Sequence, residues 1–318
     1  MYYEDLLSDG SKLNSSKEIE SYHDNLKKNV KEALDIAYDA RREGYDPKKE
    51  VEIIIAQDVA SRTEGLVGPK GVASRLREMK ENKYSKDKIV LEVGPGTGNL
   101  TTFILKKTPK KLIVVEKDNE LATNISEIFK DQLTIINDDI LNVDEKSLSS
   151  EKITVFGNLP YNISTEILSR WIVNLKTEFW FDHLVLMFQK EVADRIIADF
   201  NTSDYGRLSI LCNWKLNITK ICDIKPESFS PRPKIDSSLL FFSPKKNFFK
   251  INDPKNLEKI TRVFFNHRRK MIKKPFNQLF NGNKKVLEKL KINLNLRPQN
   301  LNIETYYKLT NEYENLGD

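Results

Sequence analysis

The chain has 318 residues, of which 39% are hydrophobic and 31% are charged, and its formal net charge is +6. This composition is typical of a globular protein, and no run of eighteen or more apolar residues predicts a membrane-spanning helix. The amino terminus lacks the basic and apolar regions of a secretory signal peptide. Cys212, Cys222 and the three scattered histidines match no disulfide framework or metal-ligand spacing. We therefore expect a cytoplasmic protein that holds no metal and does not associate with membranes.

Residues 1–82 form a polar segment that we predict to be a helical extension of unclear role, with the clearest helical spacing over residues 29–43. The glycine-rich residues 65–71 lack the Gly-Lys-Ser/Thr ending of a phosphate-binding loop, so we interpret them as an interhelical connection. Residues 52–79 resemble the amino-terminal region of the large subunit of the archaeal family D DNA polymerase. That resemblance contains no catalytic motif and implies a fusion or a chimeric gene.

From residue 83 onward, short apolar strands alternate with helical segments, which indicates an α/β fold with a parallel sheet over residues 83–245. The first predicted strand, residues 89–93, continues into a glycine-rich turn and a predicted helix. Gly94 and Gly96 in this turn allow backbone N–H groups to approach a ligand at the amino terminus of that helix. Alone, this motif is weak evidence for a nucleotide site.

Acidic residues follow the next two predicted strands. Glu116 ends the strand 112–115, where a carboxylate can accept both hydroxyls of a ribose. Asp139 follows the strand 133–136, where a carboxylate can accept a hydrogen from an adenine amine. A glycine turn and two acids at successive strand ends predict a site for S-adenosylmethionine. A dinucleotide site is less favoured, because its third glycine would come later in the chain.

The fourth predicted strand, residues 153–156, ends in an Asn-Leu-Pro-Tyr motif. Asn158 and the carbonyl of Leu159 or Pro160 can accept the two hydrogens of an exocyclic amine, and Tyr161 can stack on a flat base. The alternative interpretation is a strand-ending turn with a surface tyrosine. Beside a cofactor site, we predict a clamp for a target adenine, because two acceptors favour the pyramidal nitrogen that attacks a methyl group.

The carboxyl-terminal part, residues 246–318, is predicted to be helical and basic. Five basic side chains, His267 not counted, follow a pair of aromatic residues within the helix-length stretch 264–274, a pattern typical of contact with RNA phosphates. Arg207 precedes an apolar segment, and the sequence leaves open whether it contacts RNA or is a structural or surface charge. The candidate RNA-binding residues are Arg207, Arg268, Arg269 and Lys270.

Together these motifs resemble the small-subunit ribosomal RNA adenine dimethyltransferase family of the KsgA type, from about residue 88 to the carboxyl terminus. The matching segments are residues 90–98, Glu116, Asp139, and residues 156–164, 188–192, 205–209 and 229–237. The resemblance implies a Rossmann-like class I methyltransferase sheet with a small all-helical carboxyl-terminal domain. It also implies N6,N6-dimethylation of two adjacent adenosines near the 3′ end of small-subunit rRNA during ribosome biogenesis. We expect a monomer.

The resemblance also implies roles for individual residues. The cofactor-binding set is Gly94 and Gly96 at the cofactor backbone, Glu116 at its ribose, Asp139 at its adenine, and Asn158. The catalytic set comprises Asn158, Leu159, Pro160, Tyr161 and Phe229. Tyr161 and Phe229 would enclose the target adenine between them. From the residues alone, Phe229 is equally consistent with a lid or with a residue that fills the core.

The chain departs from the family upstream of the first strand. Family members carry a short basic segment and a Leu-Gly-Gln-Asn-Phe-Leu motif that lies over the cofactor, and residues 79–85 do not match it. Either residues 1–82 supply a substitute lid, or the lid is missing and the affinity for the cofactor is reduced, which we favour. The alternative functions are an RNA-binding ribosome-assembly factor with weak or lost catalysis, and methylation of adenine in another RNA or in DNA.

Overall fold

The structure is a computed structural model that describes residues 88–175, 178–226 and 234–316. The predictions for residues 1–82 and for Phe229 lie outside the described residues. No helix within the described part of the chain is long and apolar enough to cross a membrane.

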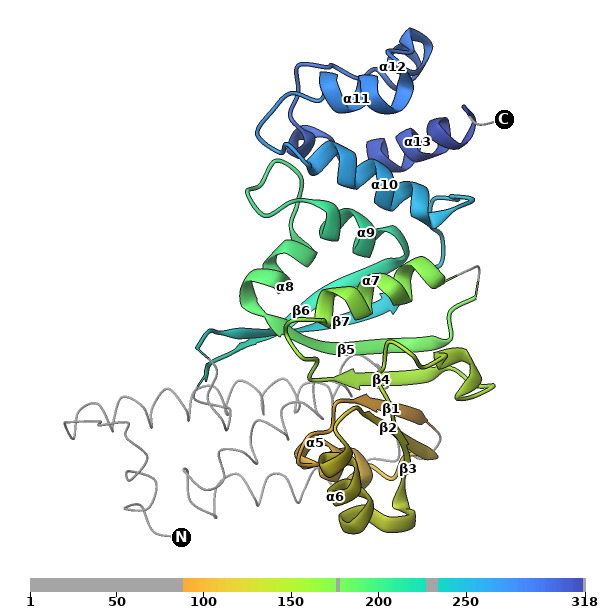
Figure 1. Ribbon diagram of the computed structural model, residues 1–318, viewed down its shortest axis with the longest axis vertical. Helices are drawn as coiled ribbons and strands as arrows, with labels where there is room; N and C mark the ends of the chain where they lie inside the picture. Colours follow the sequence, from red (N-terminus) through yellow and green to blue (C-terminus); the bar gives the residue numbers. More distant parts are fainter. Residues whose placement is uncertain (1–87, 176–177, 227–233, 317–318) are drawn as a thin grey trace, which may run out of the picture.

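The centre of the molecule is a seven-stranded sheet with the strand order β3-β2-β1-β4-β5-β7-β6 (Figure 1). The strands are β1 (Ile89–Val93), β2 (Lys111–Glu116), β3 (Thr134–Asn137), β4 (Ile153–Gly157), β5 (Phe181–Gln189), β6 (Leu216–Ile224) and β7 (Ser237–Pro244). The first five are parallel, and β7 pairs antiparallel with both β5 and β6. Every residue of β1 and β4 is buried, as expected for strands covered on both faces. The predicted Rossmann-like α/β fold is confirmed.

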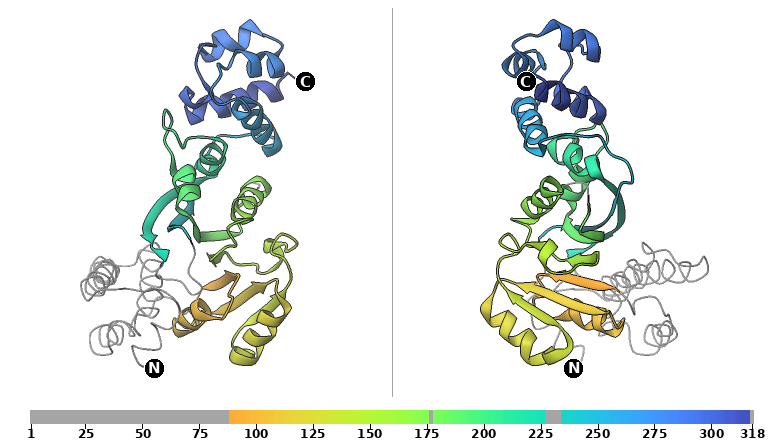
Figure 2. Two further views of the ribbon diagram at one scale, coloured as in Figure 1. Left: turned by 60° about the vertical axis from the view of Figure 1, so that its left-hand side comes forward. Right: turned by 90° about the vertical axis from the view of Figure 1, so that its right-hand side faces the viewer.

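Helices cover the two faces of the sheet, and each face has its own apolar cluster. On one face, Val90, Leu112 and Val114 pack with residues of α5 (Asn99–Lys106) and α6 (Asn119–Phe129). On the other face, the alternate positions of the same strands pack with α7 (Ser164–Asn174) and α9 (Arg207–Lys215). A further helix, α8 (Lys190–Ile197), follows β5 directly. Figure 2 shows these helices from two further directions.

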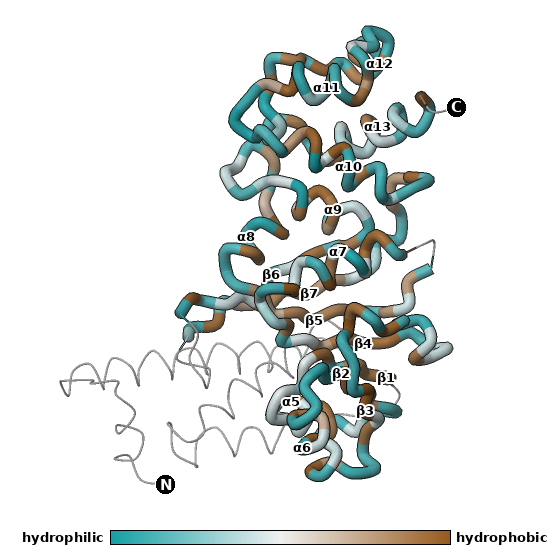
Figure 3. Tube along the Cα trace, in the orientation of Figure 1, coloured by the Kyte–Doolittle hydropathy of each residue, from teal (hydrophilic) through white to brown (hydrophobic). Residues whose placement is uncertain are grey.

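The carboxyl-terminal helices are stacked beyond α9, at the end of the molecule opposite α5 and α6 (Figure 1). They are α10 (Pro254–Phe265), α11 (Lys273–Phe280), α12 (Lys284–Leu290) and α13 (Ile303–Glu314). The Phe264 ring of α10 contacts the Tyr306 ring of α13 edge-on, at 5.7 Å between centroids. Their apolar residues belong to the same cluster as those of β4 and β5, so the core is continuous from the sheet into these helices. Figure 3 shows that the central strands are mainly hydrophobic, whereas hydrophobic and hydrophilic residues alternate along the carboxyl-terminal helices.

The basic stretch 264–274 is not a single helix, contrary to its helix-like length. Helix α10 ends at Phe265, and α11 begins at Lys273. The chain turns between them because Ile272 is fully buried and its N–H donates to the Leu296 carbonyl at 2.9 Å. All five Lys and Arg side chains of this stretch therefore belong to the interhelical turn or to the first turn of α11.

Lys215, the last residue of α9, has an unusual buried ammonium group. Its side chain donates to the Leu175 carbonyl, and its Nζ lies 3.9 Å from the centroid of the Trp214 ring. The residue is only 3% exposed. Burial and, to a smaller extent, the nearby charge of Lys146 lower the pKa of Lys215 from 10.5 to about 8. The charged form of Lys215 therefore lowers the free energy of unfolding.

We expect Lys215→Met to raise the free energy of unfolding at pH 7 by up to about 3 kcal/mol, less the value of the lost contacts. Between pH 8 and pH 10.5 the unfolded chain binds the Lys215 proton and the folded chain does not. In that window, this lysine makes the stability of the unchanged protein rise with pH, and the advantage of the variant shrinks. Urea denaturation of both proteins at pH 7 and pH 10 measures the difference. A difference that does not depend on pH would contradict this account.

Candidate active site

The turn after β1 is built on three glycines with left-handed backbone conformations. Their φ angles are 70° at Gly94, 57° at Gly96 and 81° at Gly98. The Gly94 N–H donates to the Val115 carbonyl at 2.9 Å, which ties the turn to β2. A Cβ on Gly98 would lie 2.7 Å from the Phe129 ring, whereas a Cβ on Gly96 would meet nothing within 4 Å. The turn is therefore packed tightly against α6 at Gly98 and is open at Gly96.

Replacing Gly98 with alanine is expected to lower the free energy of unfolding by about 2–4 kcal/mol, because left-handed strain and overlap with Phe129 add together. Gly282→Ala is the matched control: its φ is 69°, but the nearest atom to its Cβ lies 3.6 Å away. It should therefore cost only the strain, about 1–2 kcal/mol. Urea denaturation compares the two variants, and equal losses would show that the contact with α6 is not tight.

Glu116, the last residue of β2, connects the glycine turn to the neighbouring strand ends. Its Oε2 accepts from the Gly96 N–H at 3.2 Å, and its Oε1 accepts from the Asp118 N–H at 3.0 Å. Its backbone carbonyl accepts from the side chain of Asn137, at the end of β3, at 2.9 Å. Although Glu116 is only 8% exposed, its carboxylate lies beside the open part of the turn.

Asp139 follows β3 and remains a carboxylate held by two donors. Its Oδ2 accepts from Lys117 Nζ at 2.9 Å, and its Oδ1 accepts from the Leu141 N–H at 2.9 Å. The hydrogen bond from Lys117 lowers the pKa of Asp139, and the Leu141 N–H and the charge of Arg170 lower it further. An ionised carboxylate accepts hydrogen bonds only, so Asp139 can accept from an amine.

The Asn-Leu-Pro-Tyr motif leaves Asn158 exposed and buries Leu159, which is 1% exposed. The Pro160 carbonyl accepts from the N–H groups of Ile163 at 3.1 Å and Ser164 at 3.0 Å, and so starts α7. A carbonyl oxygen has two lone pairs, so these two bonds occupy the Pro160 carbonyl. Of the two carbonyls that the sequence left open, Leu159 is therefore the better candidate acceptor for a target amine.

The sheet register brings the candidate residues to one edge. Asn137 pairs with Glu116 across β3 and β2, and Val93, the residue before Gly94, pairs with both Val115 and Gly157. The candidate cofactor residues and the target motif therefore follow four adjacent strand ends. A Cβ on Gly94 would lie 3.6 Å from the Asn158 carbonyl, so the glycine turn and the target motif are in close proximity.

Tyr161 is linked to a residue that the sequence patterns did not single out. Its hydroxyl lies 2.6 Å from Ser237 Oγ at the start of β7, and Ser237 pairs in register with Gln189 at the end of β5. This contact joins residues far apart in the chain, and no local pattern indicates it. Because Phe229 lies outside the described residues, its predicted partnership with Tyr161 stays a prediction.

The candidate RNA-binding residues differ in their surroundings. Arg207, Arg269 and Lys270 are exposed. Arg268 instead uses its guanidinium within the chain: Nη2 donates to the Tyr205 carbonyl at 2.8 Å, and Nε donates to Gln299 Oε1 at 3.3 Å. These bonds connect the α10–α11 turn to the loop before α9 and to the short turn Pro298–Asn300 before α13, so Arg268 has a structural function besides any contact with RNA.

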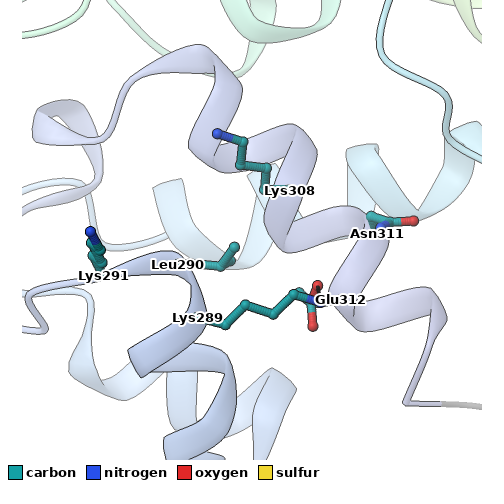
Figure 4. A pocket seen from close by; sticks show the side chains of 6 residues that line it. All are labelled: Lys289, Leu290, Lys291, Lys308, Asn311 and Glu312. Carbon is teal, nitrogen blue, oxygen red and sulfur yellow. Dashed lines mark ion pairs between the residues drawn. The ribbon is translucent and has the colours of Figure 1, made fainter.

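A surface pocket of about 450 Å³ lies between α12 and α13 (Figure 4), and Figure 1 shows these helices at the end of the molecule away from the central strands. Lys289, Leu290, Lys291, Lys308, Asn311 and Glu312 line it. Lys289 and Glu312 form an ion pair at 2.6 Å across it. Among the described residues, no group of three or more His, Cys, Asp or Glu side chains could hold a metal ion.

The sheet topology and the residues at its carboxyl edge define a Rossmann-like methyltransferase. The family model for ribosomal RNA adenine dimethylase matches residues 73–315, and the chain belongs to this family of S-adenosylmethionine-dependent enzymes. A second family model, the amino-terminal part of the DNA polymerase II large subunit DP2, matches residues 21–113. Both predicted resemblances are confirmed, and the second match extends beyond the predicted residues 52–79.

Individual relatives agree with the family match. The chain is 69% identical over 230 residues to ribosomal RNA small subunit methyltransferase A of Pelagibacter ubique, covering 72% of this chain and 88% of that protein. Its identity to the protein of the same name from Ehrlichia chaffeensis is 42%, over 71% of this chain and 86% of that protein. The crystal structure of a dimethyladenosine transferase from Plasmodium falciparum is 28% identical in sequence, with a TM-score of 0.62, and the match covers 73% of this chain and 93% of that one. The 23S rRNA methyltransferase ErmE is 20% identical, with a TM-score of 0.53 over 77% and 98%, and shares the fold.

Proposed function

We propose that this protein transfers methyl groups from S-adenosylmethionine to the N6 atoms of two adjacent adenosines near the 3′ end of small-subunit rRNA. The supporting observation is the series of Asp139, Glu116, the glycine turn and Asn158 along adjacent strand ends, in a chain whose relatives are small-subunit methyltransferases. The reaction belongs to small-subunit biogenesis in the cytoplasm. In this proposal residues 83–245 are the methyltransferase domain, and residues 246–318 bind RNA.

The residues present fit the cofactor. Because Gly96 has open space where a side chain would be, its backbone can approach a ligand closely. Glu116 would hold the ribose, Asp139 the adenine amine, and Gly94 and Asn158 the part of the cofactor nearest the target. When bound, S-adenosylmethionine supplies an electrophilic methyl group on a positively charged sulfur.

The target adenine would enter beside Asn158. The Asn158 side-chain oxygen and the Leu159 carbonyl would each accept one hydrogen of the amine, which favours a nitrogen lone pair available for attack. Tyr161 would stack on the base, held in place by its contact with Ser237. No general base is required, because the methylated amine is cationic and loses its proton to water. A target base in RNA must be unstacked to reach this site, and stacking recovers part of that cost.

Calorimetric titration of the full chain with S-adenosylmethionine, followed by methylation of small-subunit rRNA, tests the proposal. We expect binding in the micromolar range and dimethyladenosine at two adjacent positions in digests of the RNA. Methylation of a different RNA, or of DNA, would contradict the proposed substrate. RNA binding without cofactor binding would support the alternative of an assembly factor whose catalysis is lost.

The exposed residues of the α10–α11 turn give a prediction for RNA binding. The double variant Arg269→Glu and Lys270→Glu is expected to lower RNA affinity about tenfold or more, and to reduce the slope of log affinity against log salt by about 1–2. The control is Lys130→Glu with Lys152→Glu. Both lysines are exposed and lie just before β3 and β4, at the strand ends opposite to those that carry the candidate site. Filter binding at several salt concentrations measures the affinity and the slope for both double variants, and equal slopes would show that the α10–α11 turn does not contact RNA.

A further inference from the structure

The turn after β3 is held by an arginine from a different element. Arg170 of α7 donates through Nη1 to the Leu141 carbonyl at 2.6 Å and through Nη2 to the carbonyls of Ile140 and Val143, both at 3.0 Å. It also forms an ion pair with Glu145. One guanidinium therefore binds three backbone carbonyls within four residues of this turn.

The arginine is itself held in place. Its side chain is 24% exposed, and its partner Glu145 is 10% exposed. Glu145 also accepts from Trp171 Nε1 at 2.6 Å, so the carboxylate is fixed from the same helix. A planar guanidinium with several donors can bind a set of backbone carbonyls that a lysine cannot bind together. The turn and α7 are thus joined by a rigid contact.

Leu141 connects this contact to the candidate adenine site. Its carbonyl accepts from Arg170, and its N–H donates to Asp139 Oδ1 at 2.9 Å. The Asp139 backbone carbonyl in turn accepts from the Asn142 N–H at 2.8 Å, which closes the turn around the carboxylate. Because one peptide segment is held on both sides, a movement of the turn away from Arg170 would also move the Asp139 carboxylate.

The same helix also carries the target motif. Helix α7 starts with Ser164, whose N–H donates to the Pro160 carbonyl at 3.0 Å and whose hydroxyl donates to the Tyr161 carbonyl at 3.2 Å. Arg170 lies on this helix less than two turns further along the chain. Helix α7 therefore contacts both the turn that would hold the target base and the turn that would hold the cofactor adenine.

We propose that Arg170 is a positioning residue that fixes Asp139 for recognition of the N6 amine of the cofactor adenine. The inference rests on the proposed role of Asp139. It explains why a half-buried arginine binds the backbone of this turn at three carbonyls. It also gives α7 a function in aligning the cofactor with the target base.

The test compares S-adenosylhomocysteine with S-inosylhomocysteine, in which an oxygen replaces the amine. The full unchanged chain is expected to bind the adenine compound about tenfold more tightly or better, and Asp139→Ala should remove most of this preference. Arg170→Met and Arg170→Lys should each reduce the preference about fivefold or more, because neither can hold the three carbonyls. Arg195→Met is the matched control, since Arg195 is an exposed arginine that pairs with Glu191 on α8.

Calorimetry with both compounds separates the outcomes, and circular dichroism shows that each variant is folded. If the Arg170 variants weaken both compounds by the same factor, Arg170 only supports the fold and the inference is wrong. If Asp139→Ala keeps the full preference, the proposed role of Asp139 fails and the inference fails with it. Should Arg170→Met not fold, Arg170→Lys retains the charge and decides between these results.

Discussion

Replacing Asn158 with alanine is expected to lower the rate of methyl transfer by about 100- to 1000-fold while RNA affinity stays unchanged. The side chain is exposed and follows the buried strand β4, so its removal should not disturb the core. Its oxygen would accept a hydrogen of the target amine most strongly as the nitrogen becomes pyramidal. The loss should therefore appear mainly in kcat rather than in the binding of RNA.

Asn217→Ala provides the control for this result. Asn217 is also exposed, but it lies near the start of β6, where it pairs with Ser243 at the opposite end of β7 from Ser237. Its replacement should leave methyl transfer within about twofold of the unchanged protein, as for most surface positions. Single-turnover measurements with saturating rRNA compare the two variants. If Asn158→Ala keeps the kcat of the unchanged protein, the Asn158 side chain does not accept a hydrogen of the target amine.

The sequence predicted the strand ends well because a parallel sheet requires a simple chain pattern. The predicted strand 89–93 coincides with β1, and the motifs after β1, β2, β3 and β4 indeed meet at one edge. Local apolar runs determine where a buried strand ends, and the alternation with helices determines that the ends lie on the same side. Both pieces of information are local in the chain.

Contacts between distant residues could not be predicted in the same way. Tyr161 and Ser237 are separated by a long stretch of chain, and the tertiary fold alone brings them together. Arg268 was predicted from its neighbours in a basic run, yet its donors bind Tyr205 and Gln299. The charge of a residue can be read from the sequence, but which partner it reaches depends on the packing of α10 against α9.

The role proposed for Glu116 predicts that Glu116→Gln weakens the binding of S-adenosylmethionine by about 10- to 100-fold. The carboxylate already accepts from the N–H groups of Gly96 and Asp118, one on each oxygen. A glutamine must turn its NH2 group toward one of these donors, so it either loosens the glycine turn or releases the start of α6. The variant also removes the charge that would accept two ribose hydroxyls, and both effects reduce affinity for the cofactor.

Glu120→Gln is the matched control, because Glu120 lies exposed in the first turn of α6 and follows Glu116 closely in the chain. Its effect on cofactor affinity should be less than about twofold. A further comparison separates the two contributions of Glu116. A cofactor analogue without the ribose hydroxyls should bind the unchanged chain more weakly than S-adenosylmethionine does, and this difference in affinity should be smaller in Glu116→Gln. If the difference is the same in both proteins, the carboxylate only organises the glycine turn, and the ribose is held by another group.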